Sequence, residues 1–262
     1  MGERPVRVTR RHVLGVGAAG VAAIVAGCTS SPPTAAPPPV TTNPRPPVPT
    51  TTAAPTTTTV VPGGPAVQIA RATSGRAEVA LTFHGAGELA IARQIHDELA
   101  AANAKATIMA VGTWVTATPD GIKMFHDSGH DIGNHTWSHG VMTSMSTPTV
   151  LSEIERCRDA LASALGTPGA FFRQSSAQTA TQSELVEAGI AGYQRALSYD
   201  IDGLDWQDPG PTVIRKAVAK ATAGSIVSLH LGHQGTIQAL PNILSDLAAR
   251  GLRPVTATEL LA

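Results

Sequence analysis

Two histidines four residues apart carry the strongest chemical signal in this sequence. His135 and His139 lie in the segment 129–139, GHDIGNHTWSH, which is typical of a short strand running into a loop. Imidazoles at this spacing can face one point, and neutral imidazole is the commonest side-chain ligand for zinc-like ions. The segment is not an HExxH metalloprotease motif, because Thr136 occupies the glutamate position. Taken alone, the two histidines indicate a metal site about as strongly as they indicate a capping or hydrogen-bonding role.

Other polar residues are expected at the ends of predicted strands. They are His84, Arg173, Asp205 and His230. In folds built from βα units, the site forms where the carboxyl ends of the strands meet, so these side chains are candidates for one pocket.

The elements that must position these residues are alternating strands and helices. From about residue 66 onward, short β-type runs alternate with longer helical patterns, which predicts βα units. Strands are expected at 78–83, 106–111, 131–134, 170–173, 191–196, 225–230 and 253–255. Helices are expected at 88–102, 148–165, 211–221 and 237–249, and a further helix should begin at a capping box formed by Thr181 and Glu184. About seven such units in one domain predict an α/β fold of the deformed (β/α) barrel type.

The segment around His135 and His139 resembles the second motif of the polysaccharide deacetylase (NodB-homology) family, which includes chitin and peptidoglycan deacetylases. Four further motifs agree in order: 79–83 is similar to the first-motif strand, 171–173 to the third, 202–206 to the fourth and 226–230 to the fifth. The likeness extends over nearly all of residues 77–262. It implies the fold just described and a divalent, zinc-like metal that assists hydrolysis of an acetamide C–N bond.

The resemblance also assigns roles to residues at the matching positions. His135 and His139 would be metal ligands, His230 the general acid, and Asp205 the carboxylate that orients it. Arg173 would position and tune the base. The substrate contacts implied by the fourth and fifth motifs are Trp206 and Leu229.

The first motif departs from the family pattern. Active members have two adjacent aspartates there, a base and a metal ligand, whereas this sequence has His84 and Gly85. The third motif also differs, with Ser175 and Ser176 in place of Pro-Tyr. Two interpretations stay open: His84 replaces a carboxylate, as third metal ligand or as base, or the protein binds cell-wall glycan without catalysis. The first interpretation predicts N-deacetylation of peptidoglycan or another surface polysaccharide.

The N-terminal part is typical of an export signal. Arginines, including Arg10 and Arg11, precede an apolar run that ends in the lipobox-like sequence Val25–Cys28. We expect a twin-arginine-like lipoprotein signal at 1–28, lipidation at Cys28, a disordered Pro/Thr-rich tether at 29–65, and the deacetylase-like domain at 66–262. This predicts an exported protein anchored by its lipid at the outer face of the bacterial cytoplasmic membrane. An ordinary cleaved signal with a chance cysteine would also export it.

The remaining features favour structural roles. Nineteen Lys and Arg balance nineteen Asp and Glu, and no aromatic-basic stripe is present, so no nucleic-acid partner is expected. A monomer acting on a polysaccharide is expected. The other histidines are interpreted as surface, cap or loop residues, and Cys157 as a buried small hydrophobe.

Overall fold

The computed structural model describes residues 63–262 of the chain. The predicted signal, with Cys28, lies outside the described residues, and so does nearly all of the predicted tether. Within 63–262, no helix combines the length and the apolar character that crossing a membrane requires.

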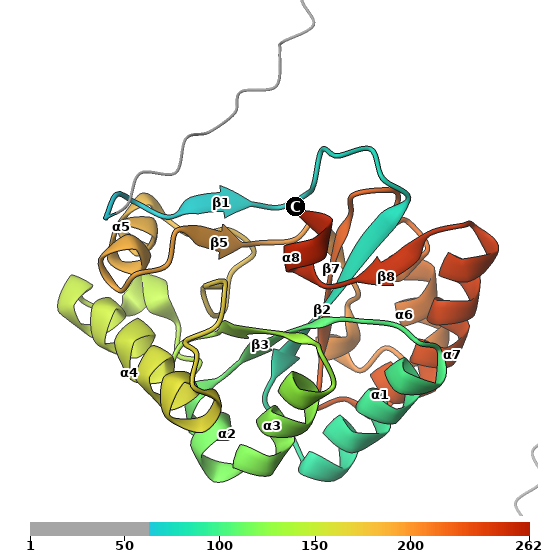
Figure 1. The fold of residues 1–262 in the computed structure, drawn as a ribbon, viewed down its shortest axis with the longest axis horizontal. Helices are drawn as coiled ribbons and strands as arrows, with labels where there is room; N and C mark the ends of the chain where they lie inside the picture. The colour runs from blue at the N-terminus through green and yellow to red at the C-terminus, as the bar shows by residue number, and fades with distance from the viewer. Residues whose placement is uncertain (1–62) are drawn as a thin grey trace, which may run out of the picture. The chain divides into compact units, whose positions relative to one another are not determined.

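The longest strand, β2 (Glu78–Gly85), lies at the centre of a parallel sheet (Figure 1). It pairs with β3 (Thr107–Ala110) on one side and β7 (Ile226–His230) on the other. The sheet order is β4-β3-β2-β7-β6, and the first residues of β2 also pair with β8. The bounds of these outer strands are Asp131–Asn134 for β4, Ile201–Asp202 for β6 and Arg253–Val255 for β8.

A second parallel pair, β1 (Val67–Ile69) and β5 (Arg195–Leu197), continues the wall of strands. Phe172 connects it to the main sheet, because this one residue bridges to β4 through Asn134 and to β5 through Ala196. An antiparallel bridge between Arg71 and Ser225 joins the segment after β1 to the start of β7. The strands therefore follow a ring, which confirms the predicted α/β fold with a deformed barrel.

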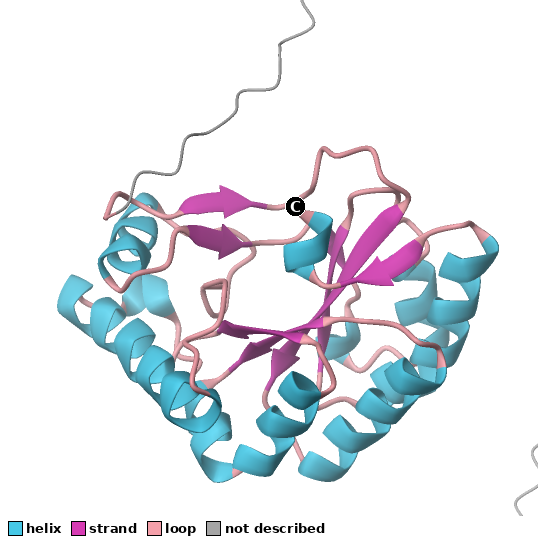
Figure 2. Cartoon of the chain, viewed as in Figure 1, coloured by secondary structure: helices cyan, strands magenta, loops and turns pink. Residues whose placement is uncertain are grey.

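The longer helices lie around the outside of the strands (Figure 2). Their bounds are α1 Leu89–Ala101, α2 Gly112–Ala117, α3 Pro119–Asp127, α4 Thr147–Leu165, α5 Gln182–Ile190, α6 Pro211–Val218 and α7 Gln234–Ala249. A short α8 (Ala257–Leu260) follows β8, and two 3₁₀ turns occupy Met142–Ser144 and Asp205–Gln207. The largest hydrophobic cluster lies between sheet and helices and includes Leu81, Ile95 and Leu240, all fully buried.

Local signals in the sequence set several of these helix ends. Thr181 and Glu184 form the expected capping box at the start of α5, each side chain bonding to the other residue's backbone N–H. At the end of α4, Gly166 adopts the left-handed conformation with φ 73°.

Two predicted strands differ from the structure. The segment predicted at 191–196 contains strand only from Arg195, because Ala191 caps α5 and Gly192 turns the chain with φ 98°. The segment predicted at 170–173 pairs only through the bridges of Phe172.

Candidate active site

Four histidines meet where the strands of the sheet end. His84 in β2 and His230 in β7 are register partners, and their ring centroids are 4.4 Å apart. His135 directly follows β4, with its ring centroid 4.4 Å from that of His84. His139 lies in the next loop, 4.8 Å from His135 between ring centroids. Residues expected at separate strand ends therefore form one cluster.

The loop that carries His135 and His139 is held by Asn134 and Thr136. The Asn134 side chain accepts a hydrogen bond from the Thr136 N–H at 2.9 Å and donates one to the Ile154 carbonyl at 2.8 Å. The Thr136 hydroxyl in turn accepts from the His139 N–H at 3.2 Å. Thr136 and His139 both have positive φ, 66° and 59°, so this turn is a strained conformation maintained by its hydrogen bonds.

The cluster brings together imidazole nitrogens of the kind that bind a divalent metal. One ring nitrogen from each of His84, His135 and His139 lies within 4.8 Å of the others. His135 Nδ1 donates to the Arg173 carbonyl at 3.0 Å, which leaves Nε2 as an acceptor. That Nε2 is buried and has no hydrogen-bond partner among residues 63–262. Burial, more than the nearby His139, lowers the pKa of His135 well below its ordinary value of 6.5, so its lone pair is available to a cation.

Arg173 is completely buried beside His84. Its Nη1 donates to His84 Nε2 at 3.1 Å and to the Thr82 hydroxyl at 2.8 Å. Burial lowers the pKa of Arg173 to about 9, which leaves the guanidinium charged at neutral pH. Burial, followed by the positive charges of neighbouring groups, also lowers the pKa of His84 well below 6.5. Within the described part of the chain, Arg173 forms no ion pair with a carboxylate.

His230 is oriented by Asp205, a fully buried carboxylate. Asp205 accepts from His230 Nδ1 at 2.8 Å and from the His230 backbone N–H at 2.7 Å. It also accepts from the Thr236 hydroxyl at 2.6 Å. Thr236 was not predicted from the sequence, because it lies in the first turn of α7 and not at the end of a strand.

A hollow of about 350 Å³ opens over this cluster. Its lining residues are His84, His139, Ser176, Ala177, Gln178, Tyr199, Asp202, Trp206, Ser228 and His230. Trp206 is 52% exposed at this hollow, and its indole N–H donates to Asp202 at 3.3 Å. Tyr199 was not anticipated from the sequence. Leu229, expected to contact substrate, is instead fully buried in the core, because alternate residues of β7 face opposite sides.

The histidines interpreted as structural lie outside this lining. His233 pairs with the exposed Asp208 at 2.8 Å, and its ring centroid is 5.6 Å from that of His230. His130 is buried and accepts a backbone hydrogen bond from Ala106. Cys157 is also buried, and burial raises the pKa of its thiol to about 12.

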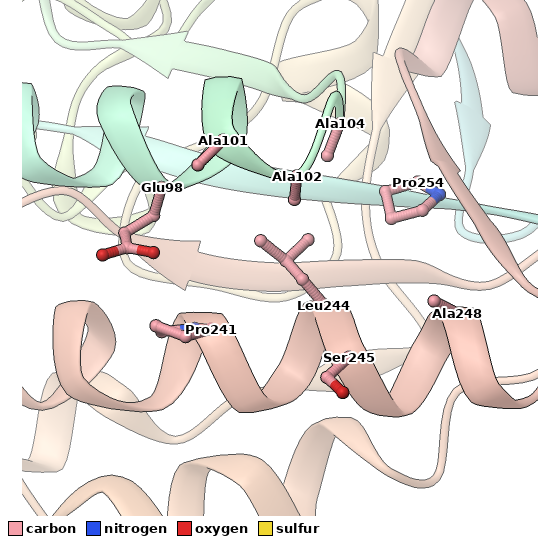
Figure 3. A pocket seen from close by; sticks show the side chains of 9 residues that line it. All are labelled: Glu98, Ala101, Ala102, Ala104, Pro241, Leu244, Ser245, Ala248 and Pro254. Atoms are coloured by element: carbon pink, nitrogen blue, oxygen red, sulfur yellow. The ribbon is translucent and has the colours of Figure 1, made fainter.

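A second hollow, of about 420 Å³, lies between α1 and α7 (Figure 3). Small and apolar side chains, among them Ala101, Leu244 and Pro254, form most of its lining. Glu98 is its one titratable side chain, so this hollow does not bring together groups that could perform acid–base or metal chemistry.

Comparisons with known proteins identify similar chains. The family model described as "Polysaccharide deacetylase" matches residues 71–194. A peptidoglycan-N-acetylglucosamine deacetylase of Bacillus cereus is 31% identical over 196 residues, which cover 70% of this chain and 87% of that protein. The peptidoglycan-N-acetylglucosamine deacetylase PgdA of Listeria monocytogenes is 28% identical over 183 residues. That match covers 70% of this chain but 38% of the longer relative.

Among solved structures, a mutant of a CE4 family pseudoenzyme from Bacillus anthracis, described as having restored enzymatic activity, superposes with a TM-score of 0.70. It is 25% identical, and the match covers 75% of this chain and 71% of that chain.

Proposed function

The chain belongs to the polysaccharide deacetylase family, and from this premise we propose that it removes acetyl groups from an N-acetylated cell-envelope polysaccharide. Peptidoglycan or a neighbouring surface glycan is the proposed substrate. The relatives named as peptidoglycan deacetylases support the choice of substrate class. The reaction is hydrolysis of an acetamide C–N bond, which yields acetate and a free amine on the sugar.

The observation that carries this proposal is the His230–Asp205 pair beside the histidine cluster. Because His230 Nδ1 donates to the buried Asp205, Nε2 is the nitrogen left to exchange a proton within the hollow. A sugar nitrogen needs a proton as the C–N bond breaks, and a positioned imidazole is well matched to that transfer near neutral pH. Trp206 offers an exposed aromatic face at the same hollow for the acetyl group or the sugar ring.

The proposed cofactor is a divalent cation, zinc in this proposal, held by His135 and His139. A bound cation of this kind supplies Lewis acidity that polarises an amide carbonyl. The unpartnered, neutral Nε2 of His135 supports this assignment. Arg173 fixes the ring of His135 through its carbonyl, so the two residues hold the ligand nitrogen in place without a carboxylate partner.

The alternative function is a catalytically inactive protein that binds cell-wall glycan. The observation that favours it is the absence of a carboxylate beside Arg173 within the described part of the chain, since His84 and Gly85 occupy the first-motif positions. Such a protein would keep the hollow and Trp206 but would lack a strong base.

Release of acetate separates the two functions. The full chain, loaded with zinc, should release acetate from N-acetylglucosamine oligomers or peptidoglycan. His230→Gln should slow this by about 10²–10⁴-fold, the range for loss of a general acid. His233→Gln is the matched control, because His233 is a nearby imidazole outside the lining, and its rate should stay within about twofold of the parent. Retained glycan binding with no acetate release by the zinc-loaded protein would favour the binding function.

We also propose that the protein is a lipoprotein anchored through Cys28 at the outer face of the cytoplasmic membrane. The lipobox-like sequence at 25–28 supports this location. Fractionation of cells that express the Cys28→Ala variant tests it: the parent should be in the membrane fraction and the variant should not. An unchanged distribution would contradict the anchor.

A further inference from the structure

Within residues 63–262, the side chain of Arg173 has four hydrogen-bond acceptors, and all of them are uncharged groups. Nε donates to the Leu197 carbonyl at 2.6 Å, and Nη2 donates to the Ser198 carbonyl at 3.2 Å. Nη1 donates to Thr82 and to His84 Nε2, the latter at 3.1 Å. A guanidinium has only donors, so every one of these partners must accept. His84 Nε2 therefore presents its lone pair to Arg173.

This contact determines which nitrogen of His84 carries the hydrogen. The Ser228 hydroxyl lies 3.2 Å from the same Nε2, and it too can only donate to that atom. A neutral imidazole has one donor and one acceptor nitrogen, so the hydrogen must be on Nδ1. Within residues 63–262, the hydrogen bonds of the His84 ring all involve Nε2, and the ring lines the hollow.

We infer that His84 is a hydrogen-bond donor to the bound ligand, through Nδ1–H, and is neither a general base nor a metal ligand. Both of the excluded roles need a lone pair, and the one lone pair of the neutral ring faces Arg173. The chemical group that such a donor takes is an acceptor oxygen, as in a carbonyl or a carboxylate. That this oxygen is the acetamide carbonyl rests on the proposed function. Which nitrogen of His84 carries the hydrogen does not rest on it.

In His135, unlike His84, the lone pair of the neutral ring is not occupied by a hydrogen bond within residues 63–262. Its Nδ1 donates to the Arg173 carbonyl and its Nε2 has no partner within residues 63–262, so its lone pair is free. Arg173 thus contacts both rings. Its guanidinium donates to the lone pair on His84 Nε2, whereas its carbonyl accepts from His135 Nδ1 and so leaves the lone pair on His135 Nε2 free. A cation in this cluster is therefore held by His135 and His139, although the nitrogens of all three histidines lie close together.

The position of the hydrogen on His84 can be measured directly. Long-range ¹H–¹⁵N correlation spectra of the metal-free full chain, labelled at histidine, distinguish a protonated from a bare ring nitrogen. The His84 signals are identified by their loss in the His84→Gln variant. At neutral pH we expect a hydrogen on Nδ1 and a bare Nε2. A hydrogen on Nε2, or on both nitrogens, would overturn the inference.

Zinc affinity gives a second readout that does not depend on activity. Glutamine can still accept from Arg173, so titration of zinc alone into metal-free His84→Gln should give an affinity within about tenfold of the parent. His135→Gln is the matched variant and should lose more than about 100-fold, beyond the range for a residue outside the ligand set. An equal loss in the two variants would overturn the inference. A parent that binds no zinc would contradict the proposed metal site, while the spectra would still decide the state of His84.

Discussion

Replacing Asp205 with asparagine removes a buried charge while it keeps the shape of the side chain. The carboxylate is fully buried and, among the described residues, accepts three hydrogen bonds, two from His230 and one from Thr236. A hydrogen bond to a charged group contributes about 1.5–3 kcal/mol, against about 0.5–1.5 kcal/mol between neutral groups. Asparagine has one carbonyl oxygen, so it can accept from His230 Nδ1 or from the His230 N–H and Thr236, but not on both sides, and its NH2 group then faces a donor. The lost and weakened bonds together should lower the free energy of unfolding by about 3 kcal/mol.

Chemical denaturation monitored by circular dichroism measures this loss, and thermal denaturation should show a Tm about 6–12 °C lower, as expected for a domain of this size. Asp208→Asn is the matched control, because that carboxylate is 72% exposed and bonds only to His233 among the described residues. The control should change the free energy of unfolding by less than about 0.5 kcal/mol. If Asp205→Asn costs no more than the control, the reasoning that Asp205 holds His230 through charge-assisted bonds is wrong.

Three further predictions concern the framework. Gly169→Ala should destabilise the fold by more than about 2 kcal/mol in urea denaturation, because its Cβ would lie 2.5 Å from the Ile132 carbonyl oxygen at φ 82°. Gly166→Ala, at a similar φ but with no atom within 4 Å, should cost only about 1 kcal/mol, and equal losses would contradict the steric argument. Burial lowers the pKa of His130 to about 4 in the folded protein. As pH drops below about 6.5, His130 therefore takes up a proton in the unfolded chain before it does so in the folded protein. The free energy of unfolding should fall between about pH 6.5 and 4, by at most about 3 kcal/mol. His130→Gln should remove that part of the pH dependence, and an unchanged slope of unfolding free energy against pH would refute it. Cys157, with a thiol pKa of about 12, should react with a thiol reagent at pH 8 only after denaturation, and rapid labelling of the native protein would contradict its burial.

Where local chemistry determines an element, the sequence was sufficient to predict it. The helix at 147–165 is bounded by a proline in its first turn and a left-handed glycine at its end, and both signals can be read without a structure. The strand β1 gave no such signal. Its three residues are stabilised by pairing with β5, which lies far along the chain. Such a strand depends on a tertiary partner that local pattern cannot reveal.

In the candidate site, too, some features could be predicted from the local sequence and others depend on tertiary contacts. The rule that polar residues gather at strand ends was enough to bring His84, His135 and His230 together as candidates. It could not indicate which nitrogen of His84 faces Arg173, because that depends on side-chain conformation and on donors from another strand end. Thr236 lies within a helix, so it does not follow the pattern. Tyr199 lies two residues after β5, but the sequence placed the end of that strand at 196 and gave no reason to single out a tyrosine.

Phe172 bridges β4 and β5, and it directly precedes Arg173, which positions His84 and His135. The pairing of these strands and the geometry of the site therefore depend on the same short segment. Between β4 and β5 the wall depends on a few backbone bonds, including Phe172 N–H to the Arg195 carbonyl at 3.1 Å and Leu197 N–H to the Phe172 carbonyl at 2.7 Å. Because its backbone pairing is shorter, we expect this seam to open before the continuous pairing of β2 with β7. Arg173 is the next residue, so an opening of this seam releases the carbonyl that orients His135 and the guanidinium that restrains His84. Local opening of the strands at Phe172 would therefore release the positions of His84 and His135 while most of the fold stays folded.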